Sequence, residues 1–595
     1  MKTPLSRLSL CICYCTVLAV AFFYYPRWNC SNTEATLSWD VSGYYMYLPA
    51  IFIYKDINKC RFKDSILDRY HPTPDFQQAF THSKSGNYIM KYSIGQAVVM
   101  APFFFMGHTY AHLSGTFPAD GFSYPYQLAI GVGMLLFAFM GLYYLRRILL
   151  LYNRDGTVAT ILLLFTIGTN YLNYAAIDQA MTHSVLFFIY TLLIYHSIQF
   201  YKSPSRRATI LIGFLVGFAT LIRPVEIISV IIPLFWSIHS ATDLKLRMAF
   251  LKKNAYLYLS TAGVAAILIF IQLLYWKVVS NEWMVFSYQD QGFYWTRPHI
   301  FSFLFDYSSG WFLYCPMMML PFIGFYVYLK NGSNILAVVL FTSLNFYLVT
   351  AWDIWDYGGF SGRAMIQSYP ILAFPFAALI DKIHHKKIMS ILLLFLIVLF
   401  AYVNIWWTHN AHRGNVKLGG VSKAYFWEVI GRWQSPDDDI IKLLDNPDFI
   451  ENNSLGGKAV YENTFDTDFS TNCINNGISM KSIFLDHSHQ FSAEYVLNAN
   501  LKGMKFIRAT ADFKSFQKEW DIWKMAQFVI KYYHNKTEIK SNFIRIFRFL
   551  NANDQKQIYM DSAIPDIPFD KVSIYFYNAN SDKKIIIDNL KVEIF

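Results

Sequence analysis

The chain has 595 residues, of which 54% are hydrophobic and only 15% charged, whereas soluble proteins carry about 25% charged residues. Together with a positive mean hydropathy of +0.27, this excludes a disordered chain, a fibrous repeat and an ordinary soluble enzyme. It predicts a polytopic membrane protein with a water-facing part. The net charge of +11 does not indicate a nucleic-acid partner, because the loop lysines and arginines that set membrane topology produce the same excess.

Membrane spans are predicted where about 20 mostly apolar residues follow one another. The sequence contains about eleven such segments. The two segments around Arg223-Pro224 are either two short spans at a tight turn or one helix that the proline interrupts. The predicted spans are residues 8–25, 125–144, 157–174, 183–201, 208–222, 224–239, 255–276, 310–329, 334–351, 364–380 and 388–407.

The basic residues between the spans predict the orientation. With the N-terminus in the cytoplasm, the short outer loops hold only Arg223, Lys277, Arg297 and Arg363. The inner segments hold Lys2, Arg7, Arg146, Arg147, Arg154, Lys202, Arg206, Arg207, Lys245, Arg247, Lys252, Lys253, Lys330, Lys382, Lys386 and Lys387. This asymmetry follows the positive-inside rule, and it places residues 26–124 and everything after residue 408 on the outer side.

The first span has an alternative interpretation. Lys2 and Arg7 before an apolar run that ends Ala19-Val20-Ala21 are also typical of a cleavable signal peptide. We expect an uncleaved anchor, and either outcome leaves residues 26–124 on the outer side.

The outer loop of residues 26–124 is too long to be a simple connector. Two of its segments, Tyr44–Tyr54 and Ser93–Ala111, are apolar and aromatic but too short or interrupted to span, so we expect helices lying in the membrane interface. Cys30 and Cys60 both fall in this loop, where a disulfide and two thiols are equally compatible with the sequence.

The remainder of the chain follows the last span. Residues 408–456 are expected to be a connector with a helical stretch, and residues 457–595 a water-facing β-sandwich. The segments Gln527–Tyr533, Phe543–Leu550 and Lys571–Tyr577 and the chain end are typical of strands. In Lys571–Tyr577 the apolar residues alternate, which predicts one buried face.

Ionisable residues at a membrane edge are costly and therefore functional candidates. Asp40 lies among aromatic residues, where apolar surroundings are expected to raise its pKa and suit it to general-base chemistry. Asp178 and His183 lie in or beside a very short outer loop and could complement Asp40, or hold a divalent metal, Mg²⁺ or Mn²⁺, together with it. The alternatives are helix caps for both aspartates and a structural role for His183.

Cations at the same edge are candidates for gripping a phosphate. They are Lys91, Arg223 and Arg363. The alternative for Arg223 is an ion pair with Glu226, and the alternative for Arg363 is simple snorkelling at a helix end. The loop before Arg363 adds Trp352, Asp353, Trp355, Asp356 and the pair Gly358-Gly359, and its aromatic faces and carboxylates suit a sugar.

Several of these features in this order resemble the GT-C membrane glycosyltransferases, such as the protein O-mannosyltransferases and the lipid A aminoarabinose transferases. The resemblance covers residues 1–407. It rests on W-D-x-x-x-Y-Y from Trp39, on K-Y-x-x-G followed by P-F-F from Lys91 to Phe104, on GFLVGFATLIRP at 213–224, and on the segment from Trp352 through Arg363 to Tyr369-Pro370. The C-terminal part is similar to carbohydrate-binding jelly rolls.

The resemblance implies an inverting transferase that moves a sugar from a polyprenyl phosphate lipid to a glycan, lipid or protein acceptor on the outer face. It implies Asp40 as the base and Asp178 as a second acid that positions the acceptor or a metal. Lys91, Arg223 and Arg363 are then the phosphate ligands. Tyr44, Tyr45, His183 and the Trp352–Asp356 segment are expected to contact substrate. Many members have paired acids in the first loop, whereas Val41 follows Asp40 here, which leaves metal dependence open.

Two other functions remain as alternatives: an inactive scaffold or glycan-binding membrane protein, and a secondary transporter. Transporters tend to show repeats and ionisable residues at the bilayer midplane, and neither feature is visible in the sequence. The expected location is a bacterial inner membrane, with the N-terminus in the cytoplasm and the C-terminal domain in the periplasm. Membrane lipids are expected neighbours, and no nucleic-acid partner is expected.

Overall fold

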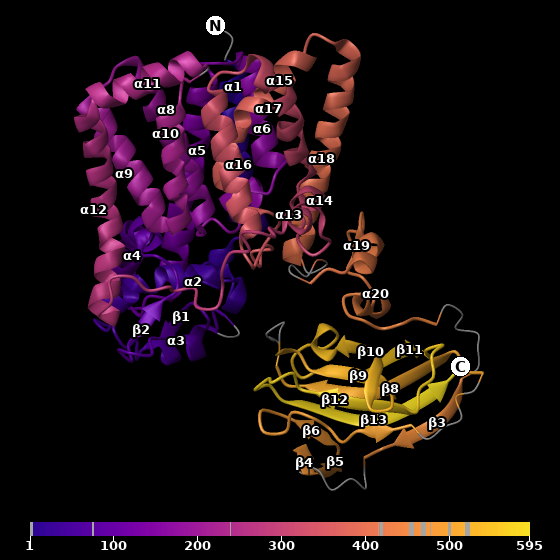
Figure 1. Ribbon diagram of the computed structural model, residues 1–595. Coiled ribbons are helices and arrows are strands. Elements are labelled where there is room, and N and C mark those ends of the chain that lie inside the picture. The colour runs from indigo at the N-terminus through magenta and orange to yellow at the C-terminus, as the bar shows by residue number, and fades with distance from the viewer. Residues whose placement is uncertain are drawn as a thin grey trace. The chain divides into compact units, whose positions relative to one another are not determined.

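The computed structural model describes residues 4–73, 76–238, 240–413, 416, 420–450, 457–465, 472–475, 478–497, 501, 503–517 and 524–595. The chain forms two compact units, Met1–Gly419 and Gly420–Phe595 (Figure 1). The first unit is helical apart from one short hairpin, and the second is built mainly of antiparallel strands.

The helices of the first unit follow one another closely along the chain. They are α1 (Leu5–Ala19), η1 (Val20–Tyr24), η2 (Arg27–Asn29), η3 (Asn32–Glu34), α2 (Asp40–Tyr45), η4 (Pro49–Ile53), α3 (Lys63–Tyr70), α4 (Gly95–Ser114), α5 (Tyr124–Leu149), α6 (Asp155–Ile167), α7 (Tyr171–Ala176), α8 (Thr182–Lys202), α9 (Arg206–Ile222), η5 (Pro224–Val230), α10 (Ile231–Phe235), α11 (Ala241–Lys253), α12 (Ala255–Ser280), α13 (Ile300–Phe305), α14 (Trp311–Tyr314), η6 (Pro316–Met318), α15 (Met319–Asn331), α16 (Ile335–Ala351), η7 (Arg363–Ser368), α17 (Tyr369–Ile383) and α18 (Lys387–Arg413). The hairpin consists of β1 (Ala79–Thr81) and β2 (Tyr88–Met90).

Six helices among the described residues are long and apolar enough to cross a membrane. They are Leu5–Asn29, Tyr124–Leu149, Thr182–Lys202, Ala255–Ser280, Arg363–Ile383 and Lys387–His412. Shorter apolar helices occupy Asp155–Ile167, Pro224–Phe235 and Ile335–Ala351. The first unit is therefore of the membrane type, and the six helices that meet this criterion are fewer than the eleven predicted spans.

Prolines lie at two breaks between apolar helices of the first unit. The predicted span 310–329 is divided at Pro316, which separates α14 from α15. At Arg223-Pro224 the structure has two separate helices, because Arg223 is extended (φ −141°, ψ 121°) between the end of α9 and the start of η5. A proline has no N–H to donate and disfavours helical geometry in the residue before it.

Within the first unit, segments that the basic residues predict on the same side contact one another. Segments predicted to be inside contact one another, as where Arg154 donates to Asp381 at 3.0 Å. Segments predicted to be outside also contact one another, as where Arg27 pairs with Asp178. In Figure 1 α11 lies at one end of this unit, and α2, α3 and the hairpin lie at the other.

Helices α9 and α12 pack with their backbones in contact. A Cβ atom on Gly213 would lie 2.4 Å from the carbonyl oxygen of Thr261, and one on Gly217 would lie 2.6 Å from the Cα of Ala265. Two glycines four residues apart put both close approaches on one helix face, as is common where membrane helices associate.

We expect Gly217→Ala to lower the thermal midpoint of the purified protein, because the added methyl group must push α12 away, at about 1–3 kcal/mol. Gly263→Ala on α12 is the matched control, since a Cβ there meets no atom within 4 Å. Thermal unfolding in detergent measures both. Equal midpoints for the two variants would contradict this packing.

The outer loop folds against the helices. Helix α4 confirms a helix over Ser93–Ala111, and it exposes an apolar face that includes Val98, Met106 and Leu113, as an interfacial helix would. The segment Tyr44–Tyr54 differs from its prediction, because its first part packs against the rest of the loop and against Tyr275 of α12, and it is buried through Ala50. Neither Cys30 nor Cys60 is in a disulfide.

Among its described residues, the second unit has two antiparallel sheets and a small separate hairpin. The sheet orders are β10-β9-β12-β7 and β11-β8-β13-β3, with β6 also paired to β13. The strands are β3 (Lys458–Asn463), β4 (Asn472–Asn475), β5 (Ile478–Lys481), β6 (Ile483–Leu485), β7 (Tyr495–Val496), β8 (Phe506–Ser515), β9 (Gln527–His534), β10 (Thr537–Arg545), β11 (Gln555–Ala563), β12 (Lys571–Tyr577) and β13 (Ile585–Ile594).

The core of the second unit lies between the two sheets. Phe513 of β8 packs against Phe528 of β9 and Phe576 of β12, with ring centroids 5.7 and 5.6 Å apart, so the sheets share one buried layer. The predicted strands over Gln527–Tyr533 and Lys571–Tyr577 are confirmed, including the buried alternating face of the latter. The prediction over Phe543–Leu550 is right for its first three residues only, because β10 ends at Arg545 and the 3-10 helix η9 (Ile546–Arg548) follows.

Residues 420–450, which the sequence assigns to a connector, belong to the second unit. Helices α19 (Lys423–Val429) and α20 (Asp438–Lys442) lie in this segment. Asp445 is fully buried and pairs with Arg545 at 2.6 Å and with Arg548 at 3.3 Å. These long-range ion pairs attach the segment to the sheets.

Candidate functional site

Asp40 lies at the first residue of α2, and its carboxylate points away from its own helix. One oxygen accepts a hydrogen bond from the hydroxyl of Tyr92 at 2.7 Å, and the other accepts from Arg363 at 2.8 Å. The cap interpretation of Asp40 is therefore wrong, because both bonds go to side chains. The preceding Trp39 has a φ of 49°, a strained conformation for a bulky residue that often marks a functional site.

Arg363 reaches Asp40 from the loop between α16 and η7. Its guanidinium also donates to the carbonyl oxygen of Tyr357, and its Nε has no hydrogen-bond partner among the described residues. A Cβ on Gly359 would lie 3.1 Å from the Arg363 side chain, so the glycine leaves room for it. Arg363 forms an ion pair with Asp40 and keeps its Nε–H as a donor without a partner among the described residues. These contacts go beyond simple snorkelling at a helix end.

Two further cations act on this carboxylate and its neighbours. The charge of Lys91 acts on Asp40, and Arg223 hydrogen-bonds the phenol of Tyr44. Neither cation has a carboxylate within 4.0 Å among the described residues. The predicted pair of Arg223 with Glu226 is absent, because Glu226 instead accepts from Tyr190 at 2.5 Å and from Gln367 at 3.0 Å.

Aromatic rings fill the space between these charges. Tyr44 packs against Tyr92 with centroids 4.3 Å apart, and Tyr92 meets Tyr288 edge to face at 6.2 Å. Lys91 lies over the ring of Tyr288 at 5.6 Å, and Tyr288 packs on Trp352 at 5.3 Å. The cations and the carboxylate thus share a site with aromatic walls.

Gly43 and Gly95, the glycines of the two outer-loop motifs, allow close packing that a side chain would block. A Cβ on Gly43 would lie 2.8 Å from the ring of Tyr92. A Cβ on Gly95 would lie 2.5 Å from the backbone of Leu221 and Ile222, at the end of α9 just before Arg223. Gly43 therefore brings α2 close to Tyr92, and Gly95 brings α4 close to Arg223.

The expected raised pKa of Asp40 is wrong. Burial does raise the pKa of this carboxyl, but the charge of Arg363, the hydrogen bonds from Tyr92 and Arg363 and the charge of Lys91 together hold it below its usual value. Burial lowers the pKa of the Lys91 ammonium, more than the charges of Asp40, Asp290 and Asp353 raise it. Asp40 is therefore ionised at neutral pH and is a carboxylate that could accept a proton.

This shift predicts how stability depends on pH. Because the pKa of Asp40 is lower in the folded than in the unfolded protein, its contribution is present above about pH 4 and is lost as the pH falls through the folded value. We expect the thermal midpoint of wild type to exceed that of Asp40→Asn at pH 6 and the difference to shrink towards pH 3. A difference that grows on acidification would mean that the pKa is raised.

Asp178 has partners of its own. It pairs with Arg27 and accepts from Asn173 at 2.8 Å, and Arg27 also donates to Ser38 at 3.1 Å. Burial raises the pKa of Asp178, but the charges of Arg27 and His412 and the Asn173 bond outweigh it, so the pKa is lowered. Asp178 does not cap α8; it ties the start of the outer loop to the loop before α8.

The predicted metal ligands Asp40, Asp178 and His183 do not come together as a metal centre in the described part of the chain. His183 is fully buried against Tyr174, with both ring nitrogens unpartnered among the described residues. Asp40 and Asp178 are each occupied by an arginine. Across the described part of the chain no three His, Cys, Asp or Glu side chains lie together as metal ligands, so Asp40, Asp178 and His183 do not fit Mg²⁺ or Mn²⁺.

The other predicted substrate residues divide into two groups. Trp352 borders the site, and Asp353 holds its loop by accepting from the amide of Gly292 at 2.9 Å. Tyr45 faces away, because it is fully buried and its hydroxyl donates to the carbonyl of Gly121 at 2.5 Å. Asp356 closes a local turn on the amide of Gly358, and no contact connects Trp355 with the described site.

Sequence reasoning missed several residues of this site. Tyr92, Tyr288 and Tyr357 surround the ions, and Arg27 neutralises Asp178. Tyr92 directly follows Lys91 in the K-Y-x-x-G motif, and this position could have identified it as a site residue. No pattern in the sequence identifies Tyr288 or Arg27, because their partners are distant along the chain.

Comparison with protein-family models finds no match to this chain, and comparison with curated proteins finds none either.

Proposed function

We propose that this protein is an inverting membrane glycosyltransferase that uses a polyprenyl phosphate-linked sugar. The observation that carries the proposal is one ionised carboxylate, Asp40, set among Arg363, Arg223 and Lys91. Two of these three cations lack a carboxylate partner among the described residues, which leaves them available for a phosphate. A carboxylate for the acceptor hydroxyl and cations for the departing phosphate are the groups that glycosyl transfer needs.

The proposed step uses these groups directly. The acceptor oxygen attacks the anomeric carbon from the face opposite the phosphate, and Asp40 takes the hydroxyl proton. The bond from that carbon to the phosphate oxygen breaks, its electron pair stays with the lipid phosphate, and the guanidinium and ammonium groups stabilise the growing charge. Arg363 touches Asp40 and has a spare Nε, so it can contact base and phosphate at once.

The proposed transfer step also gives roles to the other residues of the site. Tyr44, Tyr92, Tyr288 and Trp352 would line the sugar site. Asp178 would act as a positioning residue, because its bonds with Arg27 and Asn173 tie the start of the outer loop to the loop before α8. A topology of about eleven spans, with this site and the C-terminal β unit on the periplasmic side of a bacterial inner membrane, is part of the same proposal.

The test is sugar transfer in membranes that contain the wild-type protein. The donors are polyprenyl monophosphate sugars, polyprenyl diphosphate sugars and nucleotide sugars, each radiolabelled in the sugar. We expect label to move only from polyprenyl monophosphate donors and not in membranes that contain Asp40→Asn. Transfer from nucleotide sugars alone would overturn the proposal, and transport of free substrate without transfer would favour a transporter.

A further inference from the structure

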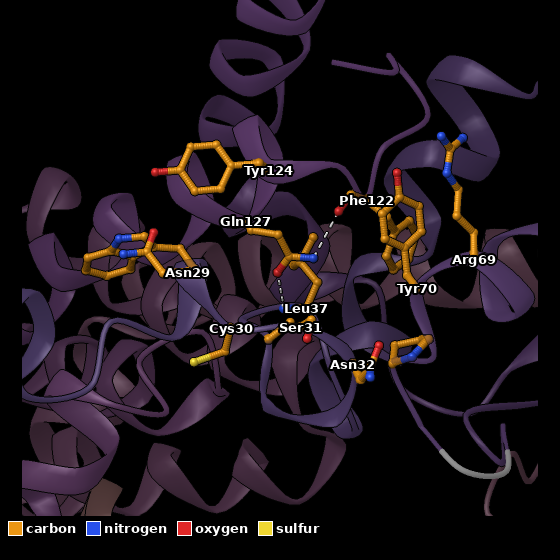
Figure 2. A pocket seen from close by; sticks show the side chains of 13 residues that line it. Asn29, Cys30, Ser31, Asn32, Leu37, Arg69, Tyr70, Phe122, Tyr124 and Gln127 are labelled. Carbon is orange, nitrogen blue, oxygen red and sulfur yellow. Dashed lines mark hydrogen bonds between the residues drawn. The ribbon is translucent and has the colours of Figure 1, made fainter. Parts of the chain in front are cut away.

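The outer loop contains a pocket that is separate from the site around Asp40. Its lining does not include Lys91, Arg223 or Arg363. It has a volume of about 240 Å³, and its walls come from the segment after η1, the end of α3 and the start of α5 (Figure 2). Pockets that bury drug-sized ligands measure about 300–1,000 Å³, so this one suits a single ring.

The floor of the pocket is held by hydrogen bonds. The side chain of Gln127 accepts from the amide of Leu37 at 2.8 Å and donates to the carbonyl of Phe122 at 3.0 Å, as the dashed lines in Figure 2 show. On one side the hydroxyl of Tyr70 donates to Asp120 at 2.6 Å. The pocket is thus built before any ligand arrives.

The rim of the pocket carries polar side chains. The side chains of Asn29 and Ser31 and the hydroxyl of Tyr124 have no hydrogen-bond partner among the described residues. Arg69 is 57% exposed and lies 3.5 Å from Asp120 and over the ring of Tyr70. Figure 2 shows Asn29, Tyr124 and Arg69 around the central Gln127.

This combination has the chemistry of a sugar site. The rings of Tyr70 and Tyr124, which are partly exposed, offer apolar surface to the C–H side of a pyranose, and the amide, hydroxyl and guanidinium groups can bond its hydroxyls. A phosphate is a poorer match, because Arg69 is the one cation that lines the pocket and Asp120 already engages it.

The pocket adjoins the candidate base. Leu37 lines it and lies three residues before Asp40, so their Cα atoms are at most about 11 Å apart. Pro72, also in the lining, accepts from the amide of Trp39 at 3.0 Å. The short segment Leu37–Trp39 therefore separates the pocket from Asp40.

We propose that this pocket holds a sugar ring of the acceptor, which makes the acceptor a glycan. The proposal rests on the proposed transferase function. The donor has its own anchor, because the cations for its phosphate lie around Asp40 and not here. A glycan bound in the pocket lies one short segment, Leu37–Trp39, away from Asp40. It could present a hydroxyl group of its next sugar residue to the Asp40 carboxylate.

Cys30 lines the pocket and provides a readout that does not depend on activity. With Cys11, Cys15 and Cys473 replaced by alanine, a membrane-impermeant maleimide reports mainly on Cys30, because Cys13, Cys60 and Cys315 are buried. We expect at least one member of a panel of methyl glycosides and disaccharides to slow labelling of Cys30 by about fivefold or more. Tyr124→Ala should remove this protection, while Tyr256→Ala, an exposed tyrosine on α12, should keep it.

Kinetic measurements show whether the sugar ring in the pocket belongs to the acceptor or to the donor. Tyr124→Ala should raise the KM for a glycan acceptor about tenfold and leave the donor KM unchanged. A rise in donor KM alone would overturn the acceptor assignment, and so would unchanged labelling across the panel with an unchanged acceptor KM. Protection of Cys30 without any transfer would support the sugar pocket and count against the transferase function instead.

Discussion

Replacing Asp40 by asparagine should reduce kcat about 10²- to 10⁴-fold while donor binding persists. The range is that of a lost general base, since the amide keeps the shape of the side chain but cannot take the acceptor proton. Donor affinity should hold, because Arg223, Lys91 and Arg363 all remain and one negative charge beside them has gone. Initial rates and donor binding to purified protein measure the two effects separately.

Asp64→Asn is the matched control for Asp40→Asn. Asp64 lies in the same outer loop, on α3, with 77% of its side chain exposed and Lys63 as its neighbour. It should transfer sugar at the wild-type rate. If the two variants are equally active, Asp40 is not the base; if both are equally inactive, the loss comes from the fold of the loop.

Replacing Arg363 by lysine should reduce kcat/KM for the donor about 10²-fold. The guanidinium of Arg363 meets Asp40 on one side, contacts the Tyr357 carbonyl and keeps Nε free, whereas an ammonium is a single point of charge that cannot bridge base and phosphate. Loss of one donor to developing charge costs about 10²–10³ in rate. The ion pair with Asp40 can persist, so the thermal midpoint should change little.

Arg61→Lys serves as the control for Arg363→Lys, because Arg61 is 84% exposed in the same loop. It should leave kcat/KM unchanged. Donor kinetics of Arg363→Lys within twofold of wild type would show that Arg363 contacts only Asp40, and the phosphate would then have to be held by Arg223 and Lys91.

Local patterns in the sequence predicted local structure well. The alternation in Lys571–Tyr577 gave a strand with those bounds, and the apolar run around Ser93–Ala111 gave a helix with an exposed apolar face. Asp40, Arg363, Arg223 and Lys91, chosen as rare charges at a predicted membrane edge, interact in one site although Asp40 and Arg363 are 323 residues apart.

What the sequence missed depends on long-range contacts. The pKa of Asp40 was predicted from its apolar neighbours in the chain, but its direction is set by Arg363 and Tyr92. Arg27, the ion-pair partner of Asp178, was missed because the two residues are 151 positions apart in the sequence. Residues 420–450 looked like a connector because their attachment to the sheets runs through Asp445 and two distant arginines.

The most direct test of the account is a balanced transfer reaction with purified protein. A polyprenyl phosphate sugar of defined anomeric configuration is incubated with a glycan acceptor, and both products are measured. We predict one equivalent of polyprenyl monophosphate for each new glycosidic bond, with the anomeric configuration inverted. Transfer without release of the lipid phosphate, or with retained configuration, would contradict a direct displacement that Asp40 assists as base.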